Sequence, residues 1–173
     1  GGAKVSDKIG VIANLIEQVD VLAIGGGMVF TFISALGHEI GKSMVDVELI
    51  ENVKGLIKRA EELNVKLLLP TDVVVAPTFS KEAPATVVSI NNIPANQMGL
   101  DIGPDSAKAY ALALQGCETV FWNGPMGVFE FPAFANGTRA VAQALSEISG
   151  FCVVGGGDSA AAIRTISIVM NIS

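Results

Sequence analysis

Residues 151–160 of the chain read FCVVGGGDSA, a short apolar run that ends in three glycines before a helix-forming segment. The same arrangement occurs in AIGGGM at residues 23–28 and in FWNGPMG at residues 121–127. Apolar runs of this length without alternation indicate strands buried on both faces. Their alternation with helices predicts an α/β fold, a Rossmann-like three-layer arrangement around a doubly wound, mainly parallel sheet.

The rest of the chain supplies further strands and helices by its apolar spacing. Residues 91–104 are rich in Asn, Pro and Gly and are expected to form a loop. The absence of a linker or a fixed repeat predicts that residues 1–173 form a single domain. Strands are expected at 21–24, 66–69, 73–76, 86–90, 119–122 and 151–154, and helices at 6–19, 28–36, 47–63, 105–114, 137–148 and after 157.

Composition narrows the classes of function. Of the 173 residues 50% are hydrophobic and 16% are charged, which excludes a disordered chain. The net charge of −6 makes nucleic acid an unexpected partner. No apolar run approaches the roughly 18 residues of a membrane span. Cys117 and Cys152 form no metal-binding pattern, so we expect reduced thiols and a cytoplasmic protein without membrane contact.

The glycine turns carry the first functional prediction. Ligands of open α/β sheets bind at the carboxyl ends of the strands, where glycine lets backbone amides approach a phosphate. One such turn is as readily structural as functional. Three of them, together with Gly1 and Gly2 before a helix, favour a phosphate-binding site.

Two known phosphate motifs resemble parts of the chain. GHEIGKS, residues 37–43, has three residues between its glycines and follows a helix, whereas a P-loop has four and follows a strand. Gly155-x-Gly157-x-x-Ala160 does fit a dinucleotide fingerprint, but only 13 residues follow it, too few for the second strand and its ribose-binding acid. A dinucleotide-binding (NAD/FAD) oxidoreductase domain therefore stays as an alternative.

Side chains for acid–base or metal chemistry are scarce. The only histidine, His38, lies in a polar turn. Phosphoryl transfer needs mainly positioning, positive charge and Mg²⁺, which suits such a site. Lys4 and Lys8 are spaced to share one helix face, as phosphate ligands or as solvated lysines. Asp158 is either a helix cap or a ligand of Mg²⁺. A Mg²⁺ ion bound to nucleotide phosphates needs only one or two protein carboxylates.

At these residues the chain resembles a known family. GGAKVSDKI, IGGGM with FTF, LLLPTDVVVA, MGLDIGP, WNGPMGVFE with FANGT, and GGGDSAAA are similar, in order and spacing, to the C-terminal domain of phosphoglycerate kinase. The similarity covers residues 1–162. It implies a glycolytic phosphotransferase with a carboxyl group as acceptor, which moves a phosphoryl group between 1,3-bisphosphoglycerate and ADP to give 3-phosphoglycerate and ATP. The family uses two Rossmann-like domains that close about a hinge, with the nucleotide on the C-terminal one.

The resemblance also implies roles for individual residues. Lys4 would contact the transferred phosphoryl group, Lys8 a nucleotide phosphate, and Asp158 the Mg²⁺ that accompanies ADP or ATP. The adenine slot would be lined by Gly2, Ala3, Gly26, Gly27, Met44, Gly99 and Leu100. The remaining nucleoside and phosphate contacts would come from Asn123, Pro125, Gly127, Val128, Glu130 (on the ribose hydroxyls), Gly156, Gly157 and Ser159.

Several family features are missing from the sequence. The phosphoglycerate-binding N-terminal domain, the strand that should precede Gly1 and the final Ser/Thr-Gly-Gly-Gly helix start are all absent, and IRTISIVMNIS at residues 163–173 is divergent. The expectation is thus a nucleotide-binding domain truncated at both ends, inactive alone because closure against the partner domain is impossible. The full enzyme is expected to be monomeric. A non-catalytic α/β fragment is the third reading.

Overall fold

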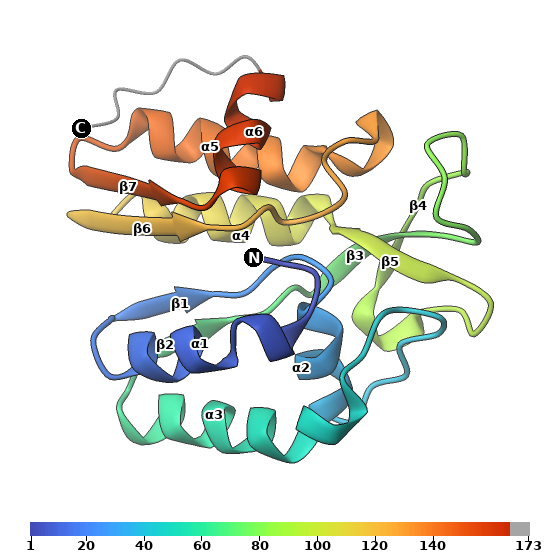
Figure 1. Cartoon of the computed structure of the whole chain (residues 1–173), viewed down its shortest axis with the longest axis horizontal. Coiled ribbons are helices and arrows are strands. Elements are labelled where there is room, and N and C mark those ends of the chain that lie inside the picture. Colours follow the sequence, from blue (N-terminus) through green and yellow to red (C-terminus); the bar gives the residue numbers. More distant parts are fainter. Residues whose placement is uncertain (167–173) are drawn as a thin grey trace.

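The structure is a computed structural model that describes residues 1–166, so residues 167–173 of the divergent stretch lie outside the described part (Figure 1). The helices in this part are α1 (Ile9–Ile16), α2 (Val29–Ala35), α3 (Ile50–Glu62), α4 (Pro104–Leu114), α5 (Asn136–Glu147) and α6 (Gly157–Ile166). Short 3₁₀ turns are η1 (Val5–Asp7), η2 (Val47–Leu49), η3 (Ile90–Asn92) and η4 (Pro132–Phe134). The strands are β1 (Val21–Ala23), β2 (Lys66–Leu68), β3 (Asp72–Ala76), β4 (Thr86–Ser89), β5 (Met98–Ile102), β6 (Thr119–Asn123) and β7 (Phe151–Gly155).

The strands form three small sheets. β1 pairs with β2 in parallel, with Val21 opposite Lys66, and β6 pairs with β7 in parallel, with Thr119 opposite Phe151. β3 lies between β4 and β5 in an antiparallel sheet. The fold is therefore mixed α/β. The predicted parallel pairing occurs in β1–β2 and in β6–β7, but the paired strands of residues 1–166 do not form one continuous, mainly parallel sheet.

The antiparallel sheet departs from the sequence prediction in two ways. The sheet was expected to be mainly parallel, but residues 77–85 join β3 to β4 without a crossover helix, and strands joined in this way pair antiparallel. β5 lies within residues 91–104, which were expected to form a loop because they are rich in Asn, Pro and Gly. It nevertheless pairs with β3, with a register shift between Val74 and Val75. β3 is buried throughout, so a continuous apolar run here marks an internal antiparallel strand.

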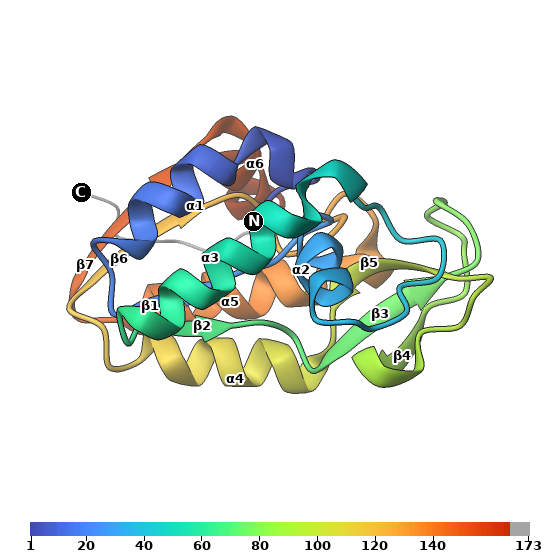
Figure 2. The ribbon, with the colours of Figure 1, turned by 90° about the horizontal axis from the view of Figure 1, so that it is seen from below.

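Two large apolar cores flank these sheets. One gathers α1, α2 and α3 around β1 and β3, and its members include Ile12 and Phe32. The other gathers α4, α5, β6 and β7, and includes Trp122 and Leu145. Figure 2 shows α1 and α4 on opposite sides of β1. The hydroxyl of Tyr110, on α4, lies 2.6 Å from the carbonyl oxygen of Ile24 and thus bonds the second core to the first.

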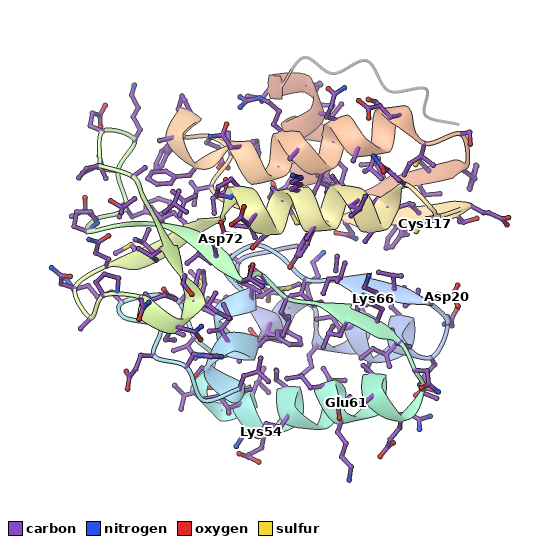
Figure 3. All side chains as sticks on the ribbon, turned by 180° about the vertical axis from the view of Figure 1, so that it is seen from behind. Asp20, Lys54, Glu61, Lys66, Asp72 and Cys117 are labelled. Carbon is purple, nitrogen blue, oxygen red and sulfur yellow. The ribbon has the colours of Figure 1, made fainter. Side chains whose placement is uncertain are left out.

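The start of α4 is fixed by a side chain that the sheet supplies. Asp72 Oδ1 accepts a hydrogen bond of 2.8 Å from the backbone N–H of Ser106, and Oδ2 accepts one of 3.1 Å from Asp105 (Figure 3). These bonds satisfy amides that an α-helix leaves free at its first turn. β3 and α4 are thereby held in a fixed relation.

Two further expectations concern membrane-spanning helices and the state of the two cysteines. Within residues 1–166, no helix combines the length and the apolar character that crossing a membrane requires. Cys117 is partly exposed and Cys152 is buried, and both are free thiols.

Candidate functional site

A cavity of about 610 Å³ lies where several strands end, and segments from distant parts of the chain line it. Its walls come from the first residues, the turn after β1, the segment before η2, β5 and the turn after β6. Most of the predicted nucleotide-site residues line it: Gly2, Ala3, Gly26, Gly27, Met44, Gly99, Leu100, Pro125, Gly127, Val128, Glu130 and Asp158. The residues predicted for the adenine slot thus line one cavity.

Gly2 and Ala3 form one wall, and two glycine turns hold residues 1–3 in place. The amino group of Gly1 donates a hydrogen bond of 2.7 Å to the carbonyl oxygen of Asn123, and the N–H of Met28 donates one of 3.1 Å to that of Gly2. A Cβ on Gly26 would lie 2.3 Å from the carbonyl oxygen of Gly2. A Cβ on Gly27 would lie 2.7 Å from that of Ala3. Backbone packing therefore explains these glycines without a ligand.

The opposite wall is built on β5. A Cβ on Gly99 would overlap the ring of Phe30. Glycine is therefore needed here for α2 to approach β5. The N–H of Gly99 donates a hydrogen bond of 2.9 Å to Oγ of Ser43. This bond brings the segment with Lys42 and Met44 to the edge of the cavity, where Met44 is 47% exposed.

A polar cluster adjoins the cavity. Nζ of Lys8 donates to the side-chain oxygen of Asn123, and the N–H of Gly124 donates a 2.6 Å bond to Oγ of Ser159. A Cβ on Gly156 would lie 3.2 Å from the same Asn123 oxygen. Asp158, in the first turn of α6, lines the cavity and so connects it with this cluster.

Not every predicted residue lies in the cavity. Lys8, Asn123, Gly156, Gly157 and Ser159 belong to the adjoining cluster or its turn rather than to the cavity wall. Gly157 is exposed, and a Cβ there would meet nothing within 4 Å. Its backbone is therefore open to solvent. Lys4 is exposed, lines neither this cavity nor the cluster, and directly follows Ala3 on the cavity wall.

Sequence reasoning missed Asp101, a buried carboxyl at the base of the cavity. Oδ2 accepts a hydrogen bond of 2.8 Å from the N–H of Gly137, and Oδ1 accepts one of 2.9 Å from Ile102. Burial raises the pKa of Asp101 to about 7, although the two backbone bonds and the charge of Arg139 act to lower it. The signal was an acidic residue inside an otherwise apolar strand, which is unusual without a partner.

Other cavity residues were also missed, three of them aromatic. They include Phe30, Phe79, Phe129 and the cation Lys42. Phe79 packs on Phe131 at the rim, with ring centroids 5.1 Å apart. Aromatic residues are usual in the walls of small-molecule sites, but a sequence cannot tell them from core residues. Lys42 was set aside with the rejected P-loop reading of residues 37–43.

The residue predicted to bind a metal at this site is Asp158. No group of three or more His, Cys, Asp or Glu side chains that could hold a metal occurs among residues 1–166. Asp158 offers an exposed carboxylate in the first turn of α6. One protein carboxylate is enough for Mg²⁺ when phosphates supply further oxygens.

Comparison with known proteins gives the family. The phosphoglycerate kinase family model matches residues 1–173. The chain is 57% identical over 171 residues to a phosphoglycerate kinase from Streptomyces griseus and 55% identical over 170 residues to one from Kineococcus radiotolerans. In each case the match covers 96% of this chain and 41–42% of the relative.

Solved structures agree with this. The phosphoglycerate kinase of Coxiella burnetii superposes with a TM-score of 0.94 at 43% identity, over 96% of this chain and 44% of that one. The enzyme of Pyrococcus horikoshii superposes with a TM-score of 0.76 at 29% identity, over 99% of this chain and 44% of that one. The chain spans less than half the length of the proteins it matches, and it belongs to the phosphoglycerate kinase family.

Proposed function

We propose that the chain is the nucleotide-binding, C-terminal part of a phosphoglycerate kinase and that ADP or ATP binds in the 610 Å³ cavity with Mg²⁺ on its phosphates. The observation that carries the proposal is the convergence of widely separated segments, each quoted for the family resemblance, on one cavity. Chance would not bring residues 2–3, 26–27, 99–100 and 125–130 to the same surface.

The nucleoside end of the cavity has the chemistry that adenosine needs. Leu100, Val128 and the backbone of Gly99 offer apolar surface on which a base can lie flat. Glu130 is exposed at the same cavity, where its carboxylate oxygens can accept hydrogen bonds from ribose hydroxyls. Met44 lies at the open edge, and its flexible thioether suits a covering role.

The phosphate end is the polar cluster around Asn123. Lys8 supplies positive charge, and the open backbone of Gly157 at the start of α6 supplies unpaired amides and a favourable dipole. Asp158 is the residue that would hold Mg²⁺, which supplies charge neutralisation for phosphoryl transfer. Lys4, exposed beside the cavity wall, would reach the transferred phosphoryl group.

The wider fold is proposed to be Rossmann-like. β1–β2 and β6–β7 are parallel pairs, and helices lie on opposite sides of β1. In the full reaction the phosphoryl donor or acceptor would sit on the phosphoglycerate-binding N-terminal domain of the monomeric enzyme. We therefore expect nucleotide binding without turnover from this chain alone.

Calorimetric titration of the chain with MgADP and MgATP tests the proposal. We expect binding at one site that weakens at least tenfold in Asp158→Asn and loses its dependence on Mg²⁺. Asp105→Asn is the matched control, because Asp105 is likewise the second residue of a helix and is exposed. It should leave binding unchanged.

A second pair of titrations locates the nucleoside. Glu130→Gln should weaken ADP but leave pyrophosphate unaffected, since only ADP carries a ribose. A folded chain that binds neither ADP nor ATP would contradict the proposal. Binding of NADH in preference to ADP would favour the dinucleotide alternative, for which Gly155 to Ala160 do run from the end of β7 into the first turn of α6.

A further inference from the structure

Asp46 lies in the segment between α2 and η2, and its side chain contacts the turn that precedes α1. Oδ2 of Asp46 accepts a hydrogen bond of 3.0 Å from the backbone N–H of Ser6, which is 40 residues away in the sequence. Ser6 is the middle residue of η1. Figure 2 shows this turn next to the segment that leads into α3. Asp46 therefore connects two parts of the chain that both contribute to the proposed nucleotide site.

The turn that Asp46 contacts carries the two lysines proposed for the phosphate end. Lys4 directly precedes η1 and Lys8 directly follows it. Val5 anchors the turn from below, because its side chain is completely buried in the first core. The first N–H groups of a helical turn have no partners within it, and the side chain of Lys4 caps none of them. Asp46 supplies an acceptor from outside the turn, so the placement of both lysines depends on it.

Asp46 is itself held by the wall of the nucleoside end. Its backbone N–H donates a hydrogen bond of 3.1 Å to Oγ1 of Thr31, a buried residue of α2. Thr31 follows Phe30, whose ring packs against Gly99 in the cavity wall. In the same segment as Asp46, Oγ of Ser43 accepts the 2.9 Å bond from the N–H of Gly99. Both connections lead to β5, the strand on which we propose that the base lies.

Asp46 thus joins the nucleoside end to the phosphate end without lining the cavity. Its N–H is fixed to α2, and its carboxylate fixes η1. A hydrogen bond that a carboxylate accepts from a backbone N–H is stronger than one between neutral groups. Loss of the carboxylate would leave the cavity walls in place but would release η1. The lysines would then be less well placed for the phosphates, although the base could still bind.

The charge of Asp46 has the wrong sign for a direct effect on phosphates. A carboxylate repels a polyphosphate, so its removal should by charge alone raise the affinity for ADP. A positioning role predicts the opposite change, because the lysines lose their fixed placement. The direction of the change in affinity therefore separates the two effects.

We propose that Asp46 is a positioning residue of the nucleotide site, which sets Lys4 and Lys8 relative to the nucleoside wall through the N–H of Ser6. The inference rests on the proposed function and adds to it a residue that touches neither the base nor the phosphates. Asp46 couples the two ends of the site because one residue is bonded to both. Its effect should therefore appear in the affinity for nucleotides with phosphates and not in the affinity for adenosine.

Calorimetric titration of Asp46→Ala with ADP and with adenosine tests the proposal. The ADP affinity should fall roughly fivefold, since η1 loses a hydrogen bond to a charged group, and the adenosine affinity should not change. Asp46→Asn keeps a side-chain oxygen as the acceptor and should restore most of the ADP affinity. Glu48→Ala is the matched control, because it removes an exposed carboxylate from the neighbouring turn η2. It should leave the ADP affinity unchanged or raise it slightly.

Two further measurements show that the effect passes through η1. In a Lys8→Ala chain, Asp46→Ala should cause no further loss of ADP affinity, because residues that act through one another are not additive. Without ligand, Asp46→Ala should speed hydrogen exchange of the Ser6 amide about tenfold, which corresponds to the loss of one hydrogen bond. The amide of Asn91, which also donates to a side-chain oxygen, should be unaffected.

The outcomes separate this inference from the proposed function. If the unsubstituted chain binds ADP and Asp46→Ala binds it equally well, the positioning role is wrong and the proposed function stands. Equal losses for ADP and adenosine would also overturn the positioning role, because they would indicate a general disruption of the cavity. So would an unchanged exchange rate of the Ser6 amide. An unsubstituted, folded chain that binds no ADP would overturn both proposals.

Discussion

The backbone N–H of Gly124 donates a hydrogen bond of 2.6 Å to Oγ of Ser159, which joins the turn after β6 to the first turn of α6. Ser159 is completely buried. Ser159→Ala should lower the free energy of unfolding by about 1–3 kcal/mol, because a buried N–H loses its acceptor. Urea unfolding measures this. Ser146→Ala removes an exposed hydroxyl on α5 and should change stability by less than about 0.5 kcal/mol. Equal effects of the two substitutions would contradict the structural role of Ser159.

Glycines of two kinds should respond in opposite directions to alanine. Gly99→Ala places a methyl group inside the ring of Phe30 and should destabilise the fold by about 1–3 kcal/mol through overpacking. Gly55→Ala, on the exposed face of α3 with nothing within 4 Å of the new methyl, should stabilise it by about 0.5–1 kcal/mol. Thermal and urea unfolding of both variants check this. A stabilising Gly99→Ala would mean that α2 does not pack against β5 as described.

The raised pKa of Asp101 predicts a pH dependence of stability. The unfolded chain releases this proton near pH 3.8, whereas the folded chain holds it until about pH 7. The free energy of unfolding should therefore fall as pH rises through that window, by up to about 4 kcal/mol. Asp101→Asn should remove this component, and Asp105→Asn should retain it. Urea unfolding between pH 4 and 8 measures both, and an unchanged slope in Asp101→Asn would refute the assignment.

The amino group of Gly1 predicts the opposite slope. The unfolded chain binds a proton there below pH 8.0, but the folded chain only below about pH 5. Stability from this group should fall as pH is lowered from 8 to 5, by up to about 4 kcal/mol. Acetylation of Gly1 removes the titrating amine and should abolish that loss. The comparison is clearest in the Asp101→Asn background, where the opposing component is absent. Equal slopes with and without the acetyl group would show that the amine is solvated.

Much of the fold followed from local pattern. The run FCVV before three glycines and the run TVFW before Asn123 gave β7 and β6 within one residue, since short apolar runs bounded by turn residues have few alternatives. β5 could not be found in this way. Its stability comes from pairing with β3, a contact between residues far apart in the sequence. Strand propensity, which depends on local sequence, does not predict such contacts.

Some residues of the candidate site were likewise predicted from local pattern, and others were not. Glycine turns and the family motifs indicated Gly26, Gly99 and Asp158, which do line one cavity. The reason for two of the glycines was different from the one expected, because Gly26 and Gly27 make room for residues 2 and 3. Asp101 and Lys42 were missed because their place in the wall depends on tertiary contacts: a buried hydrogen bond to Gly137 and the bond between Gly99 and Ser43.

The chain has one tyrosine and one tryptophan, and both line a cavity of about 760 Å³ between β1 and β6. Tyr110 reaches across to the carbonyl oxygen of Ile24, and the indole N–H of Trp122 donates to that of Gly124 at 2.8 Å. Indole emission shifts toward the red when water reaches the ring. The near-ultraviolet absorbance and fluorescence of Tyr110 and Trp122 thus report on this one cavity. Wetting, filling or collapse of that location can be followed by intrinsic fluorescence, with no label attached.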